Sequence, residues 1–341
     1  MPTSTNGDVA VATAPSTGWR EVVSKYQHTE VPRALVQLVT TLLPLAVGFT
    51  LMVLSLAWPY WVTLLLAIPT AGFLVRTFII MHDCAHSSFL PWRRANDIVG
   101  GITGLLTLTP FSQWRRDHAI HHASSGDLDR RGHGDVNTIT VREYLALSRL
   151  DRFKYRMTRQ PVALLAVGPL WLMYSQRFRT RTKATKDKQI QSVWGTNAAI
   201  VIALLVAYVL GVLPQFLMVY FPVMYFAGVA GVFLFYVQHQ FEDTYWAPHE
   251  NWDYAKASIA GSSYLKLPQP LAWLTGNIGV HHVHHISPKI PNYKLKKCHD
   301  ENPLFHDVTV VTLRDAGRTL TLSLWDEEKG RLVRFKDVKE T

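Results

Sequence analysis

The hydrophobic positions of this chain gather in two long stretches that contain no charged side chain, residues 34–75 and 197–237. Each stretch is about twice the ~20 apolar residues that a helix needs to cross a bilayer. A turn interrupts each stretch once, at Trp58-Pro59-Tyr60 and at residues 211–215. The pattern predicts two helical hairpins, because lipid cannot satisfy unpaired backbone groups. The four predicted spans cover about residues 34–57, 61–80, 198–213 and 216–237.

Shorter patterns fill the rest of the chain. Two apolar runs, 98–111 and 161–174, have 14 residues each and are too short to span comfortably. We expect them to form helices that lie in the membrane interface or dip into it. Near the C-terminus, alternating apolar positions on both sides of residues 326–330 predict a small β-hairpin.

The expected fold is an all-α integral membrane protein, in which a cap of residues 81–196 and 238–341 holds a histidine-rich site. Residues 1–18 have neither a basic start nor an apolar core, so they predict a disordered tail and no signal peptide. Residues 19–341 then form one membrane domain. The alternative is a soluble protein with two very apolar core hairpins, but 42 residues without a charge far exceed a buried core helix.

Charge gives the predicted orientation. Lys and Arg outnumber Asp and Glu by 35 to 25, a net charge of +10, and segment 81–196 alone carries 18 basic and nine acidic side chains. The two hairpin tips carry neither Lys nor Arg. By the positive-inside rule, both termini and the cap are predicted to be cytoplasmic. Cytoplasmic loops explain the basic excess better than nucleic-acid binding does, and two cysteines are too few for a disulfide scaffold.

The chain has 15 histidines, all outside the predicted spans. Most fall into three clusters, and one histidine stands alone just after the fourth span. Spacings of three and four residues put the rings of each cluster on one helical face. The nine candidate metal ligands are His82, His86, His118, His121, His122, His239, His281, His284 and His285.

Nine imidazoles are too many for one metal ion and suit two, with positions left open for a small molecule. Neutral imidazole binds iron, zinc, copper and nickel. The chain has no His-Glu-x-x-His motif, which argues against a zinc protease. It also lacks the Glu-x-x-His pairs of a soluble di-iron bundle.

Other polar residues near the clusters are candidates for supporting roles. Asp83 and Asp117 adjoin ligand candidates and could accept a hydrogen bond from a ring. His282 points about 100° away from His281 on a helix, so it should support a ligand or face solvent. Arg76 should snorkel to the headgroups or lie near His82. The remaining histidines, His28, His133, His249, His299 and His306, have no partner at ligand spacing and are interpreted as ordinary, as is Cys84.

The three clusters and the four spans together resemble the membrane fatty acid desaturases. The similarity runs from about Arg33 to Phe335 and rests on the boxes HDCAH at 82–86, HAIHH at 118–122 and HHVHH at 281–285. It is greatest to the acyl-lipid branch, of the prokaryotic omega-6 (delta-12) type.

This resemblance implies two iron ions held by the nine histidines, with O2 as the oxidant. It implies an electron donor of the ferredoxin or cytochrome b5 type and a cis double bond placed in a lipid acyl chain. Some members carry an asparagine four residues before the lone histidine, where this chain has Phe235. A His-Pro-Gly-Gly haem motif is missing, so a fused cytochrome b5 domain is not expected.

Two rival functions share some of these features. A hydroxylase or ketolase acting on an alkyl or carotenoid substrate would use the same histidine pattern, and its product would be an alcohol or ketone. A metal transporter or sensor would need histidines or carboxylates at mid-membrane depth. The charge-free spans contain none.

Overall fold

The computed structural model describes residues 18–132, 136–178 and 186–339. The described residues form a mostly helical protein, and four helices are long and apolar enough to cross a membrane. They are α2 (Val31–Ser55), α3 (Tyr60–Ala85), α10 (Asp187–Val209) and α11 (Leu213–His239). Both predicted hairpins are therefore confirmed as helix pairs. The predicted disordered tail lies outside the described residues, apart from Gly18.

The helix ends differ from the sequence prediction in an informative way. Helix α10 begins at Asp187 and not near residue 198. Its first turns are polar, so a prediction from hydropathy alone placed the helix start too late. Helices α3 and α11 continue past the predicted ends at 80 and 237. His82 therefore lies in the last turn of α3 and His239 is the last residue of α11, within continuous helical backbone hydrogen bonding. The first histidine cluster and the lone histidine are thus fixed to rigid elements.

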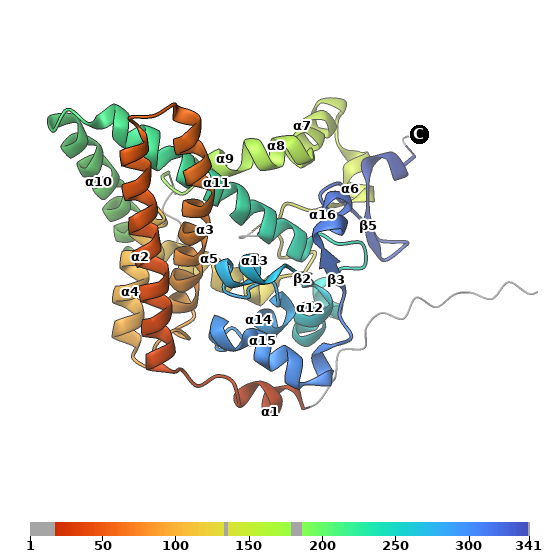
Figure 1. The fold of residues 1–341 in the computed structure, drawn as a ribbon. Helices are drawn as coiled ribbons and strands as arrows, with labels where there is room; N and C mark the ends of the chain where they lie inside the picture. The colour runs from red at the N-terminus through yellow and green to blue at the C-terminus, as the bar shows by residue number, and fades with distance from the viewer. Residues whose placement is uncertain (1–17, 133–135, 179–185, 340–341) are drawn as a thin grey trace, which may run out of the picture.

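The two hairpins pack against each other through small and apolar side chains. Figure 1 shows α2 and α3 side by side, with α11 crossing behind them toward the cap. A buried cluster joins Leu45, Leu74 and Val223 from three of these helices. Their outward side chains, such as Leu43 and Leu205, are large and exposed. Exposed apolar side chains on this scale fit a surface that contacts lipid.

Short helices make up most of the cap. They are α1 (Trp19–Ser24), α4 (Arg93–Leu106), α5 (Phe111–Ser124), α6 (Val141–Ala146), α7 (Arg149–Arg159), α8 (Pro161–Ala166), α9 (Gly168–Ser175), α12 (Tyr254–Ala260), α13 (Gln269–Leu274), α14 (His281–Ile286), α15 (Asn292–Glu301) and α16 (Leu313–Thr319). Three 3-10 turns cover His249–Asn251, Pro303–Phe305 and Phe335–Asp337. The run 98–111 is split between α4 and the start of α5, and 161–174 is split between α8 and α9. Pro110 is the N-cap residue of α5 and Pro169 lies in the first turn of α9, since proline is tolerated at the start of a helix and disfavoured in its interior.

Two small sheets interrupt the helical cap. Strand β4 (Leu324–Asp326) pairs antiparallel with β5 (Arg331–Val333) and parallel with β1 (Ile139–Thr140). The predicted hairpin around residues 326–330 is confirmed, with Gly330 at φ 60° in its turn. Strand β2 (Tyr264–Lys266) pairs parallel with β3 (Val310–Thr312). These strands tie the C-terminal segment to the rest of the cap.

Gly279 allows β2 to pack closely against the segment before α14. The Leu265 amide donates to the Gly279 carbonyl at 2.8 Å, and an added Cβ would lie 2.4 Å from the Leu265 oxygen. We expect Gly279→Ala to lower the free energy of unfolding by about 1–3 kcal/mol, because backbone must move to make room. Thermal unfolding in detergent measures this. Gly317→Ala, where an added Cβ meets nothing within 4 Å, is the matched control; equal shifts would contradict the argument.

Candidate functional site

The nine predicted ligand histidines lie together where four helices meet. Helix α3 supplies His82 and its C-cap supplies His86, while α11 ends on His239. Helices α5 and α14 supply three histidines each. Eight of the nine form two groups, in each of which the ligand atoms lie within 4.8 Å of one another. The first group is His82, His86, His118, His122 and His284, and the second is His121, His239 and His285.

His284 lies at the centre of the first group. Its Nε2 atom is 3.0 Å from Nε2 of His82 and 3.0 Å from Nε2 of His122. The ninth histidine, His281, belongs beside the second group, because its Nε2 is 3.0 Å from Nε2 of His239. Ring nitrogens from distant parts of the chain therefore converge on two neighbouring points.

The chemistry of these rings fits bound metal. Burial, and then the neighbouring imidazoles, hold the pKa of His86, His118, His122, His281, His284 and His285 well below the ordinary value of 6.5. The rings are neutral at physiological pH and each keeps one lone pair, which is the form that binds metal. The buried atoms His86 Nε2 and His285 Nε2 have no hydrogen-bond partner among the described residues. Such atoms are costly unless a ligand completes them.

Asp83 holds the ring of His82 from behind. Its Oδ1 lies 3.2 Å from His82 Nδ1, and its Oδ2 accepts hydrogen bonds from the backbone and side-chain nitrogens of Asn292 at 2.6 and 2.8 Å. The side-chain oxygen of Asn292 in turn accepts a hydrogen bond from the Gln37 side chain at 3.0 Å. A carboxylate on one ring nitrogen leaves the other nitrogen free to bind metal and fixes the ring's direction. The geometry supports the role predicted for Asp83.

The roles predicted for Asp117 and His282 have different outcomes, and that of Asp117 beside a ligand histidine stays a prediction. Asp117 accepts a hydrogen bond from Gln113 at 2.9 Å on its own helix. His282 is fully buried, so the solvent-facing interpretation is wrong. Its Nε2 lies 3.1 Å from Nδ1 of His299, which the sequence left as an ordinary histidine, and His306 lies beyond it. Only the fold could reveal this side cluster, since its members come from α14, α15 and the turn that follows.

Arg76 does not snorkel, since it is only 6% exposed. Its guanidinium donates to the Thr41 hydroxyl at 3.1 Å and to the Trp273 carbonyl, and lies 3.9 Å from the centre of the Trp273 ring. The side chain thus fastens α13 to α2 and α3. A role beside His82 gains no support from these contacts and stays a prediction.

The remaining histidines behave in different ways. His28 is exposed and lies 3.7 Å from Glu30. His249 contacts Asp127, and His133 is outside the described residues. Trp114 was not among the predicted site residues, and its ring stacks on that of His118 with a centroid distance of 4.3 Å and an interplanar angle of 24°. The available signal was its spacing, because residues 114 and 118 share one face of α5.

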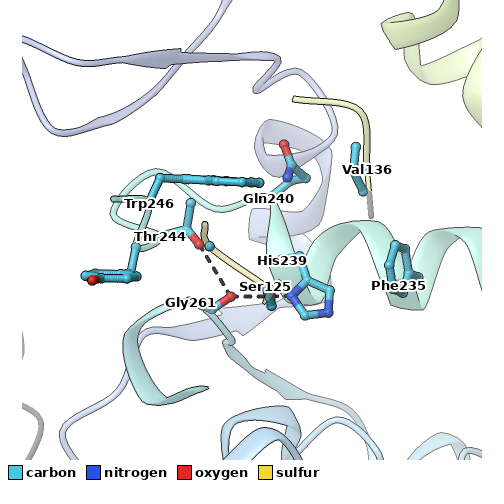
Figure 2. Close-up of a pocket in the computed structure, with 10 residues that line it drawn as sticks. Ser125, Val136, Phe235, His239, Gln240, Thr244, Trp246 and Gly261 are labelled. Carbon is cyan, nitrogen blue, oxygen red and sulfur yellow. Dashed lines mark hydrogen bonds between the residues drawn. The ribbon is translucent and has the colours of Figure 1, made fainter. Parts of the chain in front are cut away.

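A small cavity opens beside His239 (Figure 2). It is lined by Ser125, Gly126, Val136, Phe235, His239, Gln240, Thr244, Tyr245, Trp246 and Gly261. His239 Nδ1 donates to the Gly261 carbonyl at 3.4 Å, so Nε2 is left to face the other histidines. The Phe235 ring lies 5.0 Å from that of His239 and 5.3 Å from that of His121. Val136, Phe235 and Trp246 form the apolar part of this wall, next to the second histidine group.

Asp127 joins the loops that border this cavity through its hydrogen bonds, and its ionisation should make the stability of the fold depend on pH. The carboxylate is 0% exposed, and it accepts hydrogen bonds from Arg130 at 2.6 Å, His249 at 2.8 Å and the Asp129 amide at 3.0 Å. Burial acts to raise the pKa of Asp127, but these hydrogen bonds together lower it below the ordinary value of 3.8. A folded-state pKa below the unfolded one means that the carboxylate stabilises the fold above about pH 4 and loses this effect in more acidic solution.

We therefore expect Asp127→Asn to lower the free energy of unfolding by roughly 1–3 kcal/mol near neutral pH. The difference from the unsubstituted protein should shrink as the solution is taken from about pH 6 to about pH 3. Unfolding midpoints over this range measure it. Asp300→Asn, which removes an exposed partner of Lys296, should show almost no difference at any pH. If the difference in unfolding free energy between Asp127→Asn and the unsubstituted protein does not change with pH, the stabilising role of the Asp127 carboxylate is wrong.

Comparison with known proteins places this site in context. A family model described as fatty acid desaturase matches residues 55–311. A fatty acid desaturase of Bacillus subtilis is 43% identical over 93% of this chain and 90% of its own length. The sn-1 oleoyl-lipid 12-desaturase of Synechocystis sp. is 27% identical over 78% of this chain and 75% of its own. The chloroplastic omega-6 fatty acid desaturase of Arabidopsis thaliana is 25% identical over 74% and 56%.

Proposed function

Because the chain belongs to the fatty acid desaturase family, we propose that it uses O2 to place a cis double bond in a lipid-linked acyl chain. We propose the delta-12 or omega-6 type, since relatives at 25–27% identity carry the names 12-desaturase and omega-6 desaturase. The observation that carries the proposal is the convergence of nine histidines, seven of them buried, from four helix ends. The chain is an oxidoreductase, as its family is.

The two histidine groups are proposed to hold two iron ions. His82, His86, His118, His122 and His284 would hold one ion, and His121, His239, His281 and His285 the other. Iron with O2 supplies the oxidising power that removes hydrogen from an unactivated CH2 group, which side chains alone lack. Imidazole suits iron, and a set without carboxylates leaves the positive charge of the ions largely uncompensated.

The residues around the histidines position the reactants. Asp83 fixes the ring of His82, and the Gly261 carbonyl fixes that of His239. Phe235 and Val136 line the small cavity beside His239. An acyl chain is proposed to widen this cavity as it enters, so that these side chains shield its CH2 groups from water. The position of the double bond would then depend on how far the chain enters before this wall stops it.

An external electron donor of the ferredoxin or cytochrome b5 type is proposed for the basic side of the protein. Both termini and the cap are proposed to be cytoplasmic, because the basic side chains of 81–196 lie away from the hairpin tips. An acidic donor should then bind less tightly as salt rises, since screening weakens contacts between exposed charges. A turnover rate that ignores ionic strength would contradict this docking.

The function is tested by expression in a host that lacks polyunsaturated lipids, followed by mass spectrometry of its fatty acids. A new diunsaturated acyl chain with a delta-12 double bond is the expected product. A double bond at another carbon would correct the regiochemistry alone. An alcohol or a ketone would instead favour the hydroxylase or ketolase, and unchanged lipids in cells that contain the folded protein would contradict both.

A further inference from the structure

Helix α7 carries an apolar stripe that nothing in the described residues covers. Leu150 and Phe153 are each 61% exposed and Met157 is 47% exposed. Steps of three and four residues place the three side chains in one row along the helix. The opposite face is already used, because Tyr155 and Arg159 are buried there. Tyr155 donates to the Ser323 carbonyl at 2.8 Å and Arg159 donates to Gln240 at 2.8 Å.

Positive charge borders the stripe on both sides. On a helix with 3.6 residues per turn, Lys154 lies on one edge of the row and Arg149 and Arg156 lie on the other. Lys154 and Arg149 are exposed, and Arg156 is half-buried. The helix as a whole has five basic side chains and one acidic one, Asp151. An apolar row between cations is the pattern of a helix that lies on a membrane surface.

The neighbouring elements connect this stripe to the lipid-facing surface. Helices α8 and α9 follow directly and contain no charged residue. Their exposed side chains include Val162 at 79% and Trp171 at 65%. The Ala166 carbonyl at the end of α8 accepts a hydrogen bond at 3.2 Å from Tyr225 of the apolar helix α11. Figure 1 shows α7, α8 and α9 as one row that leads to α11.

We propose that α7 lies on the membrane surface, with Leu150, Phe153 and Met157 in the outer part of the acyl layer and Arg149 and Lys154 against anionic lipid headgroups. The apolar row supplies burial, and each cation near an anionic surface adds attraction. The partner is lipid and not an acidic protein, because the stripe continues into the uncharged, exposed side chains of α8 and α9. This surface does not depend on which reaction the site performs.

The test places a nitroxide on Phe153→Cys and measures its collisions with oxygen, which prefers lipid, and with a water-soluble nickel chelate. Both natural cysteines, Cys84 and Cys298, are buried, so the unsubstituted protein gives the background label. The metal-loaded protein is reconstituted in nanodiscs of phosphatidylcholine, alone or mixed with phosphatidylglycerol. Leu205→Cys on the outer face of α10 is the lipid reference, and Glu328→Cys in the β4–β5 turn is the water reference.

We expect the oxygen-to-nickel collision ratio at position 153 to be several-fold above that of Glu328→Cys and near that of Leu205→Cys. It should rise further with phosphatidylglycerol, and the Arg149→Gln, Lys154→Gln double variant should remove that rise. Met157→Cys repeats the measurement if Phe153→Cys does not fold. A ratio like that of Glu328→Cys in both lipids overturns the proposal. Shielding that appears only after an acidic donor protein is added overturns it in favour of a protein partner, and a ratio indifferent to phosphatidylglycerol overturns the anionic headgroup.

Discussion

Replacing His284 with alanine should abolish formation of unsaturated product and deplete the protein of iron. His284 Nε2 is the atom that lies 3.0 Å from both His82 and His122, so its loss opens the centre of the first histidine group. Partners outside a metal's ligand shell already contribute about 10–100-fold to affinity or activity, and loss of a ligand itself should cost at least ~100-fold. Product analysis and metal content per protein, measured on the same preparation, give the two readouts.

The control is His282→Gln in the same helix. His282 faces His299 and not the histidine groups, so this substitution removes a buried histidine without opening the proposed metal site. It should lower thermal stability while keeping iron at the level of the unsubstituted protein. If His284→Ala folds and still forms product with a full iron content, the ligand assignment is wrong.

Replacing Asp83 with asparagine should weaken iron binding by about 10–100-fold, the usual effect of losing a carboxylate that orients a ligand histidine. The amide carries no negative charge to attract the His82 ring proton. The amide also has one acceptor oxygen in place of two, so it cannot accept from the His82 ring and from the two nitrogens of Asn292 at the same time. Titration with a competing chelator measures the change in affinity directly, apart from any effect on turnover.

Asp97→Asn is the matched control for Asp83→Asn. Asp97 pairs with Arg115 at 2.7 Å but is about half exposed, and such a pair contributes only about 0–1 kcal/mol. Its iron affinity should equal that of the unsubstituted protein. Equal losses in the two variants would mean that Asp83 acts on the fold as a whole and not on His82.

Local patterns were enough to predict the hairpins and the ligand candidates. A charge-free stretch twice the thickness of a bilayer has few alternatives to a hairpin of helices. Histidines three and four residues apart share a helix face in any fold that keeps the helix. The β-hairpin around residues 326–330 was predictable for the same reason, since its two strands are neighbours in the chain. The helix ends were less predictable, because α10 begins in polar residues outside the apolar stretch.

Contacts between distant segments were beyond the sequence. Asp83 and Asn292 are 209 residues apart, and nothing in either local segment indicates that they meet. The direction of His282 toward His299, and of Arg76 toward Trp273, depends on where α15 and α13 pack. Snorkelling was predicted for Arg76 because the sequence shows a cation near the end of a span. It does not show that α13 covers this side chain.

By itself, the sequence determined that this protein forms two apolar helical hairpins and that its histidine clusters lie in the charged segments outside them. Hydropathy and residue spacing are properties of one segment, so predictions made from them do not depend on how the segments pack. Only the tertiary structure decided how the histidines divide into two groups, and that Asn292 meets the Asp83 carboxylate behind His82. Those features depend on side chains from separate helices meeting at distances of a few ångströms, which packing alone sets.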